Sequence, residues 1–157
     1  SAARSMYVDV REAILGLSTP LGEGSLSGAL DAYTRRFSEA SKLAVSVEST
    51  PAHVGDDLSP EVTANVMRIV QEALTNVRKH AVAQRVTIRL ANEEAGLTIT
   101  VEDDGRGFDP AGEPSPSDWP HFGRETIRQR ASAIGATADW DSAPGRGTRL
   151  RVVVPVN

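Results

Sequence analysis

The sequence predicts an α+β fold of two layers, in which a mixed, mostly antiparallel sheet carries helices packed on one face. The chain has 157 residues, and the 39% that are hydrophobic suffice for one core rather than two independent domains. Helical and alternating patterns follow one another in the order ααβαββαββ. Neighbouring strand patterns form pairs with helical patterns between the pairs, an order typical of helices lying against one side of a sheet.

Composition excludes several classes of function. The 17 Lys and Arg residues against 21 Asp and Glu leave a net charge of −4, so no general basic field favours nucleic acid. Without cysteine there is no disulfide framework, thiol nucleophile or zinc–thiolate site, which fits a reducing compartment, and we expect a cytoplasmic location. No apolar run approaches the roughly 20 residues that span a bilayer, so we expect no membrane insertion by this segment.

Two helical patterns and one strand pattern occupy the first third of the chain. Apolar residues recur at helical spacing over residues 6–17 and again over residues 26–41. The first pattern lacks a clear cap and precedes a breaker stretch, residues 18–25, so it has the character of the end of a longer helix. Residues 44–48 alternate between apolar and polar side chains, which predicts a strand.

A long helix and a β-hairpin are expected next. Ser59 is a strong N-cap and Pro60 suits the first helical position, so the helix should run from Pro60 to about His80. Residues 85–91 and 97–102 alternate on either side of a short polar stretch that contains glycine, which predicts two adjacent antiparallel strands.

An irregular loop and a final helix with two strands complete the prediction. Residues 108–120 hold four of the 9 prolines of the chain, which is typical of a loop. Apolar residues around Ile127 predict a short helix that stops at Gly135, a residue suited to the position after a helix end. Strands are expected near residues 137–142 and 148–154.

The predicted helix from Pro60 has a polar face separate from its apolar stripe. Glu72, Asn76, Lys79 and His80 lie at i, i+4, i+7 and i+8, so they share one side of the helix. This face is either a solvated surface with an i,i+4 pair, or a site where a Glu or Asn oxygen binds Mg²⁺ and Lys79 meets a phosphate. Spacing alone leaves both interpretations open.

An acidic, glycine-bearing turn follows the predicted hairpin, in the order Asp103-Asp104-Gly105-Arg106-Gly107-Phe108. The two glycines permit a positive φ and a close approach of a ligand to the backbone. An Asp carboxylate can accept a hydrogen bond from an amino group such as that of adenine. The alternative is a tight turn capped by Asp, because Asp-Gly turns are common.

Two further motifs place glycine beside a predicted strand or helix. A turn with glycines leads into the last strand, in the order Ser142-Ala143-Pro144-Gly145-Arg146-Gly147-Thr148, and a hairpin turn without further function is the alternative. In His121-Phe122-Gly123-Arg124 a glycine is expected where a helix begins, and backbone N–H groups at a helix start favour phosphate.

In this order the four motifs resemble the ATP-binding fold, of the Bergerat type, of the gyrase, Hsp90, histidine kinase and MutL superfamily. Gln71-Glu72-Ala73-Leu74-Thr75-Asn76-Val77-Arg78-Lys79-His80-Ala81 looks like the N box of sensor histidine kinases of the nitrate/nitrite-sensor and oxygen-sensor type. His121-Phe122-Gly123 followed by Ile127-Arg128-Gln129-Arg130-Ala131 is similar to the G2 box of that subfamily. The resemblance covers about Leu26 to Val156.

The resemblance implies a role for the polar helix face at the phosphates of ATP. Asn76 would coordinate the Mg²⁺ that bridges the phosphates. Lys79 and His80 would face the phosphates, and Glu72 would sit beside the metal and polarise its waters. These four residues are the catalytic candidates, with Asn76 as the metal ligand.

The glycine-bearing motifs would bind the rest of the nucleotide. By this resemblance Asp103 would accept a hydrogen bond from the adenine amino group, and Gly105 and Gly107 would let their loop lie against the nucleotide. Thr148, which follows Gly147, would support the adenine pocket.

The segment from Phe108 to Phe122 would form the ATP lid, with His121, Phe122 and Gly123 as nucleotide-binding residues at its end. Two residues depart from the family pattern. Pro120 stands where the family often has the first Gly of the G2 box, and Arg124 stands where it usually has Leu. Pro removes an N–H donor and would stiffen the lid. Arg124 either adds a phosphate contact or replaces an apolar lid anchor, and the sequence leaves both open.

The implied reaction is transfer of the γ-phosphoryl group of ATP to a histidine, and from phosphohistidine to an aspartate of a response regulator. In the family the acceptor lies on a dimerisation helix next to an acidic residue, a setting that His53, His80 and His121 do not share. We therefore expect residues 1–24 to be the end of that helix and a linker, and residues 25–157 to be a monomeric ATP-binding catalytic domain of a dimeric parent. The expected partners are ATP, the parent's acceptor domain and the cognate response regulator.

Three other functions remain open on the same fold. One is a nucleotide-responsive interaction module that makes little or no use of ATP, which the departures at Pro120 and Arg124 would allow. The second is a Ser/Thr anti-sigma-factor kinase, whose acceptor is a separate protein. The third is a water-hydrolysing member of the superfamily, which usually continues into a transducer domain.

Overall fold

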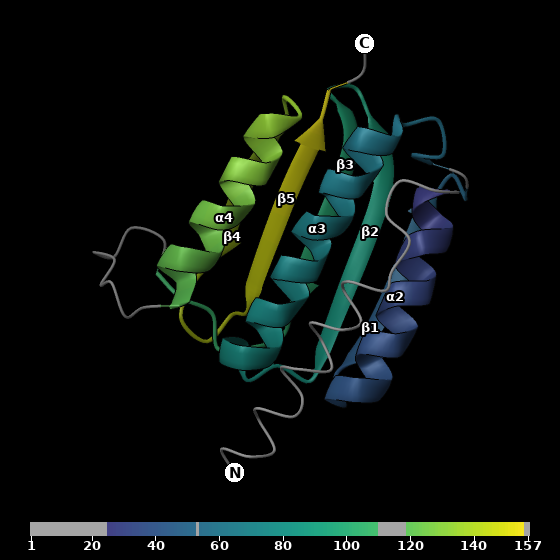
Figure 1. Ribbon diagram of the computed structural model, residues 1–157. Helices are drawn as coiled ribbons and strands as arrows, with labels where there is room; N and C mark the ends of the chain where they lie inside the picture. Colours follow the sequence, from purple (N-terminus) through teal and green to yellow (C-terminus); the bar gives the residue numbers. More distant parts are fainter. Residues whose placement is uncertain (1–24, 53, 110–118, 156–157) are drawn as a thin grey trace.

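The computed structural model describes residues 25–52, 54–109 and 119–155, with the side chains of 119–122 left out. The expected helix over residues 6–17, the proposed division at residue 24 and most of the expected loop over residues 108–120 lie outside the described residues. Nine elements follow one another in the described part of the chain, in an order that agrees with the predicted one (Figure 1).

The five strands among the described residues form one sheet in the order β1-β2-β3-β5-β4. Strands β1 and β2 are parallel, whereas β2–β3, β3–β5 and β5–β4 are antiparallel pairs. The predicted mixed, mostly antiparallel sheet is therefore confirmed. The strands are β1 (Ala44–Thr50), β2 (Arg85–Glu93), β3 (Gly96–Asp103), β4 (Thr137–Ser142) and β5 (Thr148–Val154).

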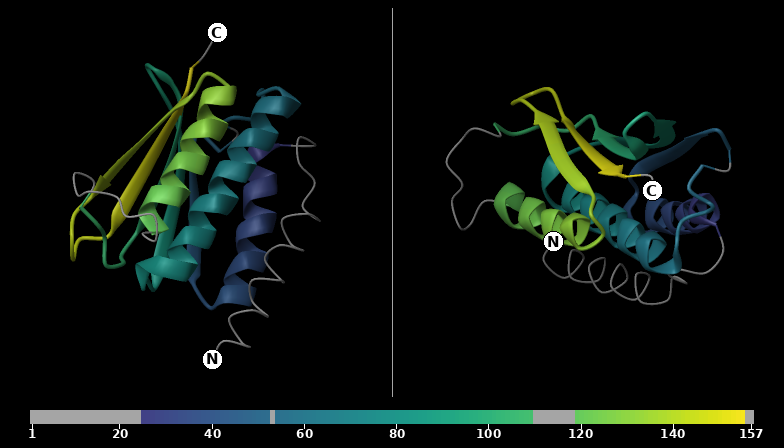
Figure 2. Two further views of the ribbon diagram at one scale, coloured as in Figure 1. Left: turned by 60° about the vertical axis from the view of Figure 1, so that its left-hand side comes forward. Right: turned by 90° about the horizontal axis from the view of Figure 1, so that it is seen from above.

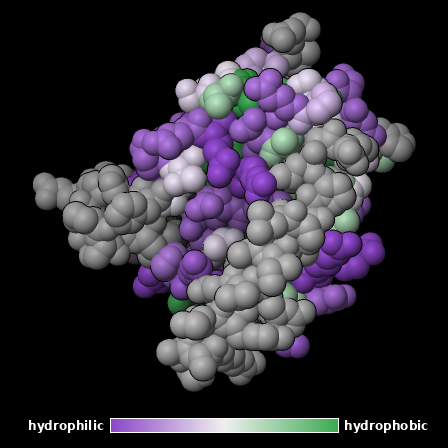
Figure 3. Space-filling view, in the orientation of Figure 1, coloured by the Kyte–Doolittle hydropathy of each residue, from purple (hydrophilic) through white to green (hydrophobic). Residues whose placement is uncertain are grey.

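Within the described ranges, the helices α2 (Leu26–Ser41), α3 (Pro60–Asn76) and α4 (Trp119–Ala133) cover one face of this sheet (Figure 2). Helix α3 continues into a π-helical turn η1 (Val77–Ala81). Apolar side chains from both layers meet in one buried core, which includes Phe37 and Leu74 from the helices and Ile99 from the sheet. On the helix side, hydrophilic residues dominate the described surface (Figure 3).

The opposite face of the sheet carries a row of exposed ion pairs. Arg89 Nε lies 2.9 Å from Glu48, and its guanidinium lies 3.6 Å from Glu102, which also pairs with Arg149 at 2.9 Å. Exposed pairs of this kind contribute little to stability. The row shows that this face points to solvent, as predicted for a sheet with helices on one side.

The helix boundaries that rest on capping residues agree with the sequence. The Ser59 hydroxyl accepts from the backbone N–H of Val62 at 3.2 Å, as an N-cap residue should. Gly135 has a φ of +71° just beyond α4, and the N–H of Ala136 donates to the carbonyl of Ala131 at 2.9 Å. This is the pattern of a helix that ends at a glycine in the left-handed region.

Helix α4 begins at Trp119, which corrects the expected lid. Residues 119–122 were expected in the loop that ends at Phe122, but their backbone forms the first turn of α4. The physical reason is that Pro120, the second residue of α4, lies in the first turn. Backbone N–H groups there have no partner within the helix, so a proline costs no hydrogen bond. Pro120 therefore lies in the first turn of a helix, and its effect on the lid stays a prediction.

Candidate functional site

Four segments converge at one end of the molecule. The loop after β3 is held against η1, because the N–H of Arg106 donates to the carbonyl of Ala81 at 2.7 Å. The same loop is held to the β4–β5 turn, because the N–H of Gly145 donates to the carbonyl of Arg106 at 2.7 Å. Gly123 and Arg124, in the N-terminal half of α4, lie beside them. These contacts bring the acidic turn, the polar helix face and the last glycine motif into one site.

Asp103 ends β3 with its side chain buried, and the residue is only 8% exposed. Its Oδ1 accepts a hydrogen bond from the N–H of Gly105 at 2.8 Å. Burial raises the pKa of Asp103, and the charges of Asp104 and Glu102 raise it further, whereas hydrogen bonds from the N–H groups of Gly105 and Thr148 oppose the rise. A carboxylate that is kept buried at such a cost is a candidate for ligand recognition.

Asp104, the next residue, is exposed and has a different task. Its Oδ1 accepts from the N–H groups of Gln84 at 2.9 Å and Arg85 at 3.0 Å. These hydrogen bonds lower the pKa of Asp104. Asp104 therefore holds the start of β2 to the end of β3, and its role is structural.

The glycines of the acidic turn are required by contacts within the protein. A Cβ on Gly105 would overlap the carbonyl oxygen of Ala81, and one on Gly107, whose φ is +66°, would overlap that of Ala143. These contacts explain why both positions are glycine without a bound nucleotide, and the role of the two glycines in nucleotide binding stays a prediction. Gly147 likewise has a φ of +72° and lies against the carbonyl of Asp103.

The polar helix face lies where α3 passes into η1. Glu72 and Asn76 are half-buried, Lys79 is exposed and His80 is half-buried. Residues 77–81 form a π-helical turn, which the α-helical spacing did not predict, and such turns are frequent at functional sites. Burial lowers the pKa of His80, and the charges of Lys79, Arg106 and Arg78 lower it further, so its imidazole is mainly neutral at neutral pH.

Gly123 contacts Asn76 directly, because a Cβ on Gly123 would overlap the Asn76 amide nitrogen. Gly123 is the fifth residue of α4, so its N–H lies beyond the four free donors of a helix start. This corrects the expectation that Gly123 begins the helix and offers its N–H to phosphate. The glycine instead allows α4 to approach the side chain of Asn76. The side chains of His121 and Phe122 lie outside the described part of the structure.

A narrow hollow between the helices and the sheet is lined by three of the predicted site residues, Asn76, Asp103 and Thr148, whereas Glu72, Lys79 and His80 lie outside its lining. Its volume of about 30 Å³ leaves room for about one water. The Arg124 guanidinium lies 4.9 Å from the centre of the Phe108 ring, and Arg128 lies 5.0 Å from that of Trp140. A purine would enter only if the side chains of Phe108 and Arg124 moved. The hollow is lined by Ala73, Asn76, Val77, Val101, Asp103, Phe108, Arg124, Ile127, Trp140, Thr148 and Leu150.

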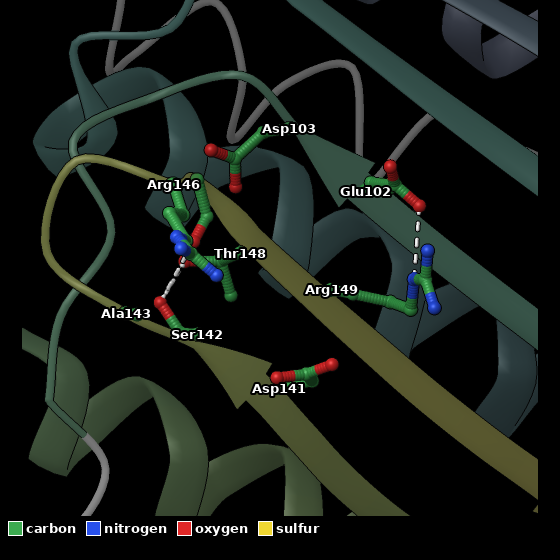
Figure 4. Close-up of a pocket in the computed structure, with 9 residues that line it drawn as sticks. Glu102, Asp103, Asp141, Ser142, Ala143, Arg146, Thr148 and Arg149 are labelled. Atoms are coloured by element: carbon green, nitrogen blue, oxygen red, sulfur yellow. Dashed lines mark hydrogen bonds and ion pairs between the residues drawn. The ribbon is translucent and has the colours of Figure 1, made fainter.

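A larger hollow, of about 210 Å³, lies at the β4–β5 turn (Figure 4). It shares Asp103 and Thr148 with the narrow hollow, but charged side chains such as Asp141 and Arg146 dominate the rest of its lining. Of the two, the narrow hollow is the better candidate for binding a base, because it combines apolar walls with Asn76, Asp103 and Thr148.

Ser142 is part of the last glycine motif, but no role at the site was predicted for it from the sequence. Its hydroxyl accepts from the N–H of Phe108 at 2.9 Å and lies 2.9 Å from both the Gly147 carbonyl and the Thr148 hydroxyl. A serine before a Pro-Gly turn is also what an ordinary turn contains, so only its place at the start of the last glycine motif could have drawn attention to it.

The residues present fit a magnesium ion only as part of a larger ligand set. Among the described residues, no three His, Asp or Glu side chains gather closely enough to hold a metal. Asn76 offers one amide oxygen, a hard donor. Mg²⁺ commonly takes one or two protein oxygens and completes its shell with waters and substrate phosphates, so a lone Asn76 fits such an ion bound together with a nucleotide.

The sheet, its one-sided helices and the carboxylate and amide at one hollow define the class of α+β ATP-binding domains. The chain belongs to the family of histidine kinase-, DNA gyrase B- and HSP90-like ATPases, whose family model matches residues 61–157. The family predicted from the motifs is thereby confirmed.

The curated relatives include a sensor protein and a sensor histidine kinase. The chain is 38% identical over 93 residues to the sensor protein VraS of Staphylococcus saprophyticus, and 37% identical over 99 residues to the sensor histidine kinase LiaS of Bacillus subtilis. These matches cover 59% and 63% of this chain, which spans about a quarter (26%) of the length of each relative.

The fold also matches a solved kinase. The histidine kinase domain of the blue-light-activated histidine kinase of Erythrobacter litoralis superposes with a TM-score of 0.67 at 26% identity, over 83% of this chain and 61% of that one. The chain is thus an ATPase domain of the sensor histidine kinase type. In the described part of this chain, no helix has both the length and the apolar character needed to cross a bilayer.

Proposed function

We propose that this domain binds Mg²⁺-ATP and transfers its γ-phosphoryl group to a histidine on the dimerisation domain of its parent kinase, for relay to an aspartate of a response regulator. The observation that carries the proposal is that Asn76, Asp103 and Thr148, which come from three separate elements, line one hollow. Relatives named as sensor histidine kinases support the acceptor class. The parent is proposed to be a homodimer and this domain a monomer.

Recognition of the base is assigned to the sheet end. Asp103 is buried and accepts hydrogen bonds, so it pairs with an amino group of the base. The apolar walls of the narrow hollow, among them Leu150 and Trp140, would pack on the base once Phe108 and Arg124 move aside. Burial of the ring together with one directed hydrogen bond is the usual basis of selective binding in such pockets.

Recognition of the phosphates is assigned to the end of α3 and η1. Asn76 would hold Mg²⁺, which when bound neutralises charge on the phosphate oxygens. Lys79 is exposed and can place its ammonium on a phosphate, and His80, mainly neutral, can donate one hydrogen bond to a phosphate oxygen. Glu72, one turn before Asn76, would accept hydrogen bonds from waters around the phosphates.

The transfer itself requires positioning more than covalent chemistry by the protein. A nitrogen of the acceptor imidazole would form a bond to the γ-phosphorus while the bond from that phosphorus to the bridging oxygen of the β-phosphate breaks. ADP leaves with the electron pair of that bond, and the imidazole loses its proton to solvent or to a nearby base. The residues of this chain hold the nucleotide in line and exclude water from the γ-phosphate.

Calorimetric titration with a nonhydrolysable ATP analogue, with and without Mg²⁺, tests nucleotide binding. We expect binding that needs Mg²⁺ and that is lost in Asn76→Ala and Asp103→Ala. Asn65→Ala is the matched control, because Asn65 lies on α3 with its amide donating to the carbonyl of Glu61 at 3.0 Å. Binding whose affinity is unchanged by removal of Mg²⁺, by Asn76→Ala and by Asp103→Ala would contradict the assigned site.

Transfer is tested by adding a purified histidine acceptor domain from a sensor kinase of this family together with radiolabelled ATP. We expect acid-labile phosphate on that domain. Acid-stable phosphate on a serine of an added anti-sigma antagonist would favour the Ser/Thr kinase. Release of phosphate to water without transfer would favour the hydrolysing members of the superfamily, and ATP binding with neither outcome would favour the interaction module, which the narrowness of the hollow also allows.

A further inference from the structure

Ser142 stands at the junction of three parts of the site. It is the last residue of β4, and its partner across the sheet is Thr148 of β5. Figure 4 shows its hydroxyl directed toward the neighbouring strand that carries Thr148. The same hydroxyl accepts from the N–H of Phe108, where the chain leaves the acidic turn. One side chain therefore contacts both the last glycine motif and Phe108, which lines the narrow hollow.

The partners of Ser142 determine which way its hydrogen bonds run. A serine hydroxyl has one proton to donate and two lone pairs that accept. The N–H of Phe108 can only donate to it, and the carbonyl of Gly147 can only accept from it. In the arrangement that satisfies every group, the Ser142 hydroxyl donates its hydrogen bond to the carbonyl of Gly147. The Thr148 hydroxyl must then donate to the Ser142 oxygen, over the 2.9 Å between them.

This direction leaves the Thr148 oxygen as an acceptor toward the hollow. Its only proton is engaged by Ser142, while its lone pairs remain available. Asp103 is the cross-strand partner of Thr148 on the other side and lines the same hollow. The hollow thus presents two acceptors side by side, which suit an amino group and oppose a carbonyl oxygen.

We infer that Ser142 is a positioning residue for base selectivity, which holds the Thr148 hydroxyl as an acceptor so that the site takes a 6-aminopurine and rejects a 6-oxopurine. The inference rests on the proposed function, since it concerns the same nucleotide. Without the Ser142 hydroxyl, Thr148 is free to turn its proton into the hollow and to donate to a 6-oxo group. The N–H of Phe108 and the carbonyl of Gly147 would lose their partner as well.

The test compares two nucleotides in the unmodified domain and in three variants. Dissociation constants are measured by calorimetry for nonhydrolysable analogues of ATP and of inosine triphosphate, which carries a 6-oxo group. In Ser142→Ala we expect affinity for the ATP analogue to fall about tenfold and the preference for it over the inosine analogue to shrink by a similar factor. Ser142→Thr keeps the hydroxyl and should restore both. Ser132→Ala, at an exposed serine of α4, is the control.

The base preference distinguishes selectivity from a general loss of structure, because a structural defect weakens both nucleotides equally. If Ser142→Ala does not fold, Thr148→Val removes the same acceptor while keeping the shape of the side chain, and the same loss of preference is expected. An unchanged preference in the folded variants would overturn the inference alone. Failure of the unmodified domain to bind either nucleotide would overturn the proposed function and this inference with it.

Discussion

Asp103 and Asp104 are neighbours in the chain, yet their carboxylates bind backbone groups of different segments. Oδ1 of Asp103 accepts from Gly105 within its own turn, whereas Oδ1 of Asp104 accepts from Gln84 and Arg85 at the start of β2. The pKa of Asp103 is raised by burial and that of Asp104 is lowered by its hydrogen bonds. The two acids therefore affect stability in opposite directions as pH changes.

The free energy of unfolding, measured as a function of pH, should distinguish the contributions of Asp103 and Asp104 to stability. The lowered pKa means that Asp104 stabilises the fold above its unfolded value of 3.8, and that this is lost as pH falls through the lower, folded value. Asp104→Asn should lower the free energy of unfolding by about 1 kcal/mol at neutral pH, as expected for lost hydrogen bonds to a charged acceptor, and by less in acid.

Asp103→Asn should show the opposite dependence. With a raised pKa, the Asp103 carboxyl favours folding below 3.8, and this contribution is lost as pH rises through the folded value. The variant should therefore be at least as stable as the unmodified domain at neutral pH, with the difference closing in acid. Urea unfolding of both variants checks this. A large loss of stability in Asp103→Asn at neutral pH would show that Asp103 is structural and would weaken its assignment to the base.

Gly123→Ala should weaken nucleotide binding through Asn76. The new methyl group would overlap the Asn76 amide, so that side chain must move. Replacing a glycine inside a helix by alanine contributes about 1 kcal/mol, which offsets the strain, so stability should change little. We expect a loss of about tenfold or more in Mg²⁺-dependent affinity for the ATP analogue, because small displacements of a binding group are costly. Ser132→Ala on the same helix is the control. Unchanged affinity in Gly123→Ala would contradict the assignment of Asn76 as a ligand of Mg²⁺.

Arg124→Leu should distinguish the two roles that the sequence left open. Burial and the charge of Arg128 lower the pKa of Arg124, so an anion beside its guanidinium would be favourable. If Arg124 binds a phosphate, Arg124→Leu should lower the affinity for ATP about tenfold and leave the affinity for adenosine unchanged. Arg124→Lys, which keeps the positive charge, should lower the affinity for ATP by less. Equal changes for ATP and adenosine would instead show that Arg124 acts by filling the hollow beside Phe108.

Val82→Asn should stabilise the domain. Val82 is 82% exposed and has a φ of +52° just after η1, a conformation that is unfavourable for a β-branched residue. Asn tolerates this region, so we expect a gain of about 1 kcal/mol in the free energy of unfolding, measured with urea. Val82→Thr, which keeps the branch at Cβ, should give no gain. A gain in both variants would point to the loss of exposed apolar surface instead of relief of backbone strain.

Much of the fold could be predicted because its signals are local. Ser59 and Gly135 mark helix ends through their own conformations, and the alternation of the hairpin strands reports which side of each faces the core. The start of α4 escaped prediction because its first turn contains Pro120, which is common in loops and equally acceptable at a helix start. The π-helical turn η1 escaped because no side-chain spacing distinguishes it from a continued α-helix.

The candidate site divides in the same way. The order and spacing of the motifs around Asn76 and Asp103 were sufficient to predict the ATPase family, since a motif is a local pattern. That Gly123 touches Asn76, that Gly105 is required by Ala81, and that the hollow is nearly filled depend on contacts between segments far apart in the chain.

The sequence by itself determined the elements, their order, the one-sided sheet and the identity of the polar groups at its end. Only the tertiary structure decided how those groups are used, because the pairing of β3 with β5 and of β5 with β4 places Asp103, Thr148 and Ser142 side by side. A hydrogen-bond direction, such as that of the Thr148 hydroxyl, follows from all partners within reach of an atom. No segment of the chain contains that information alone.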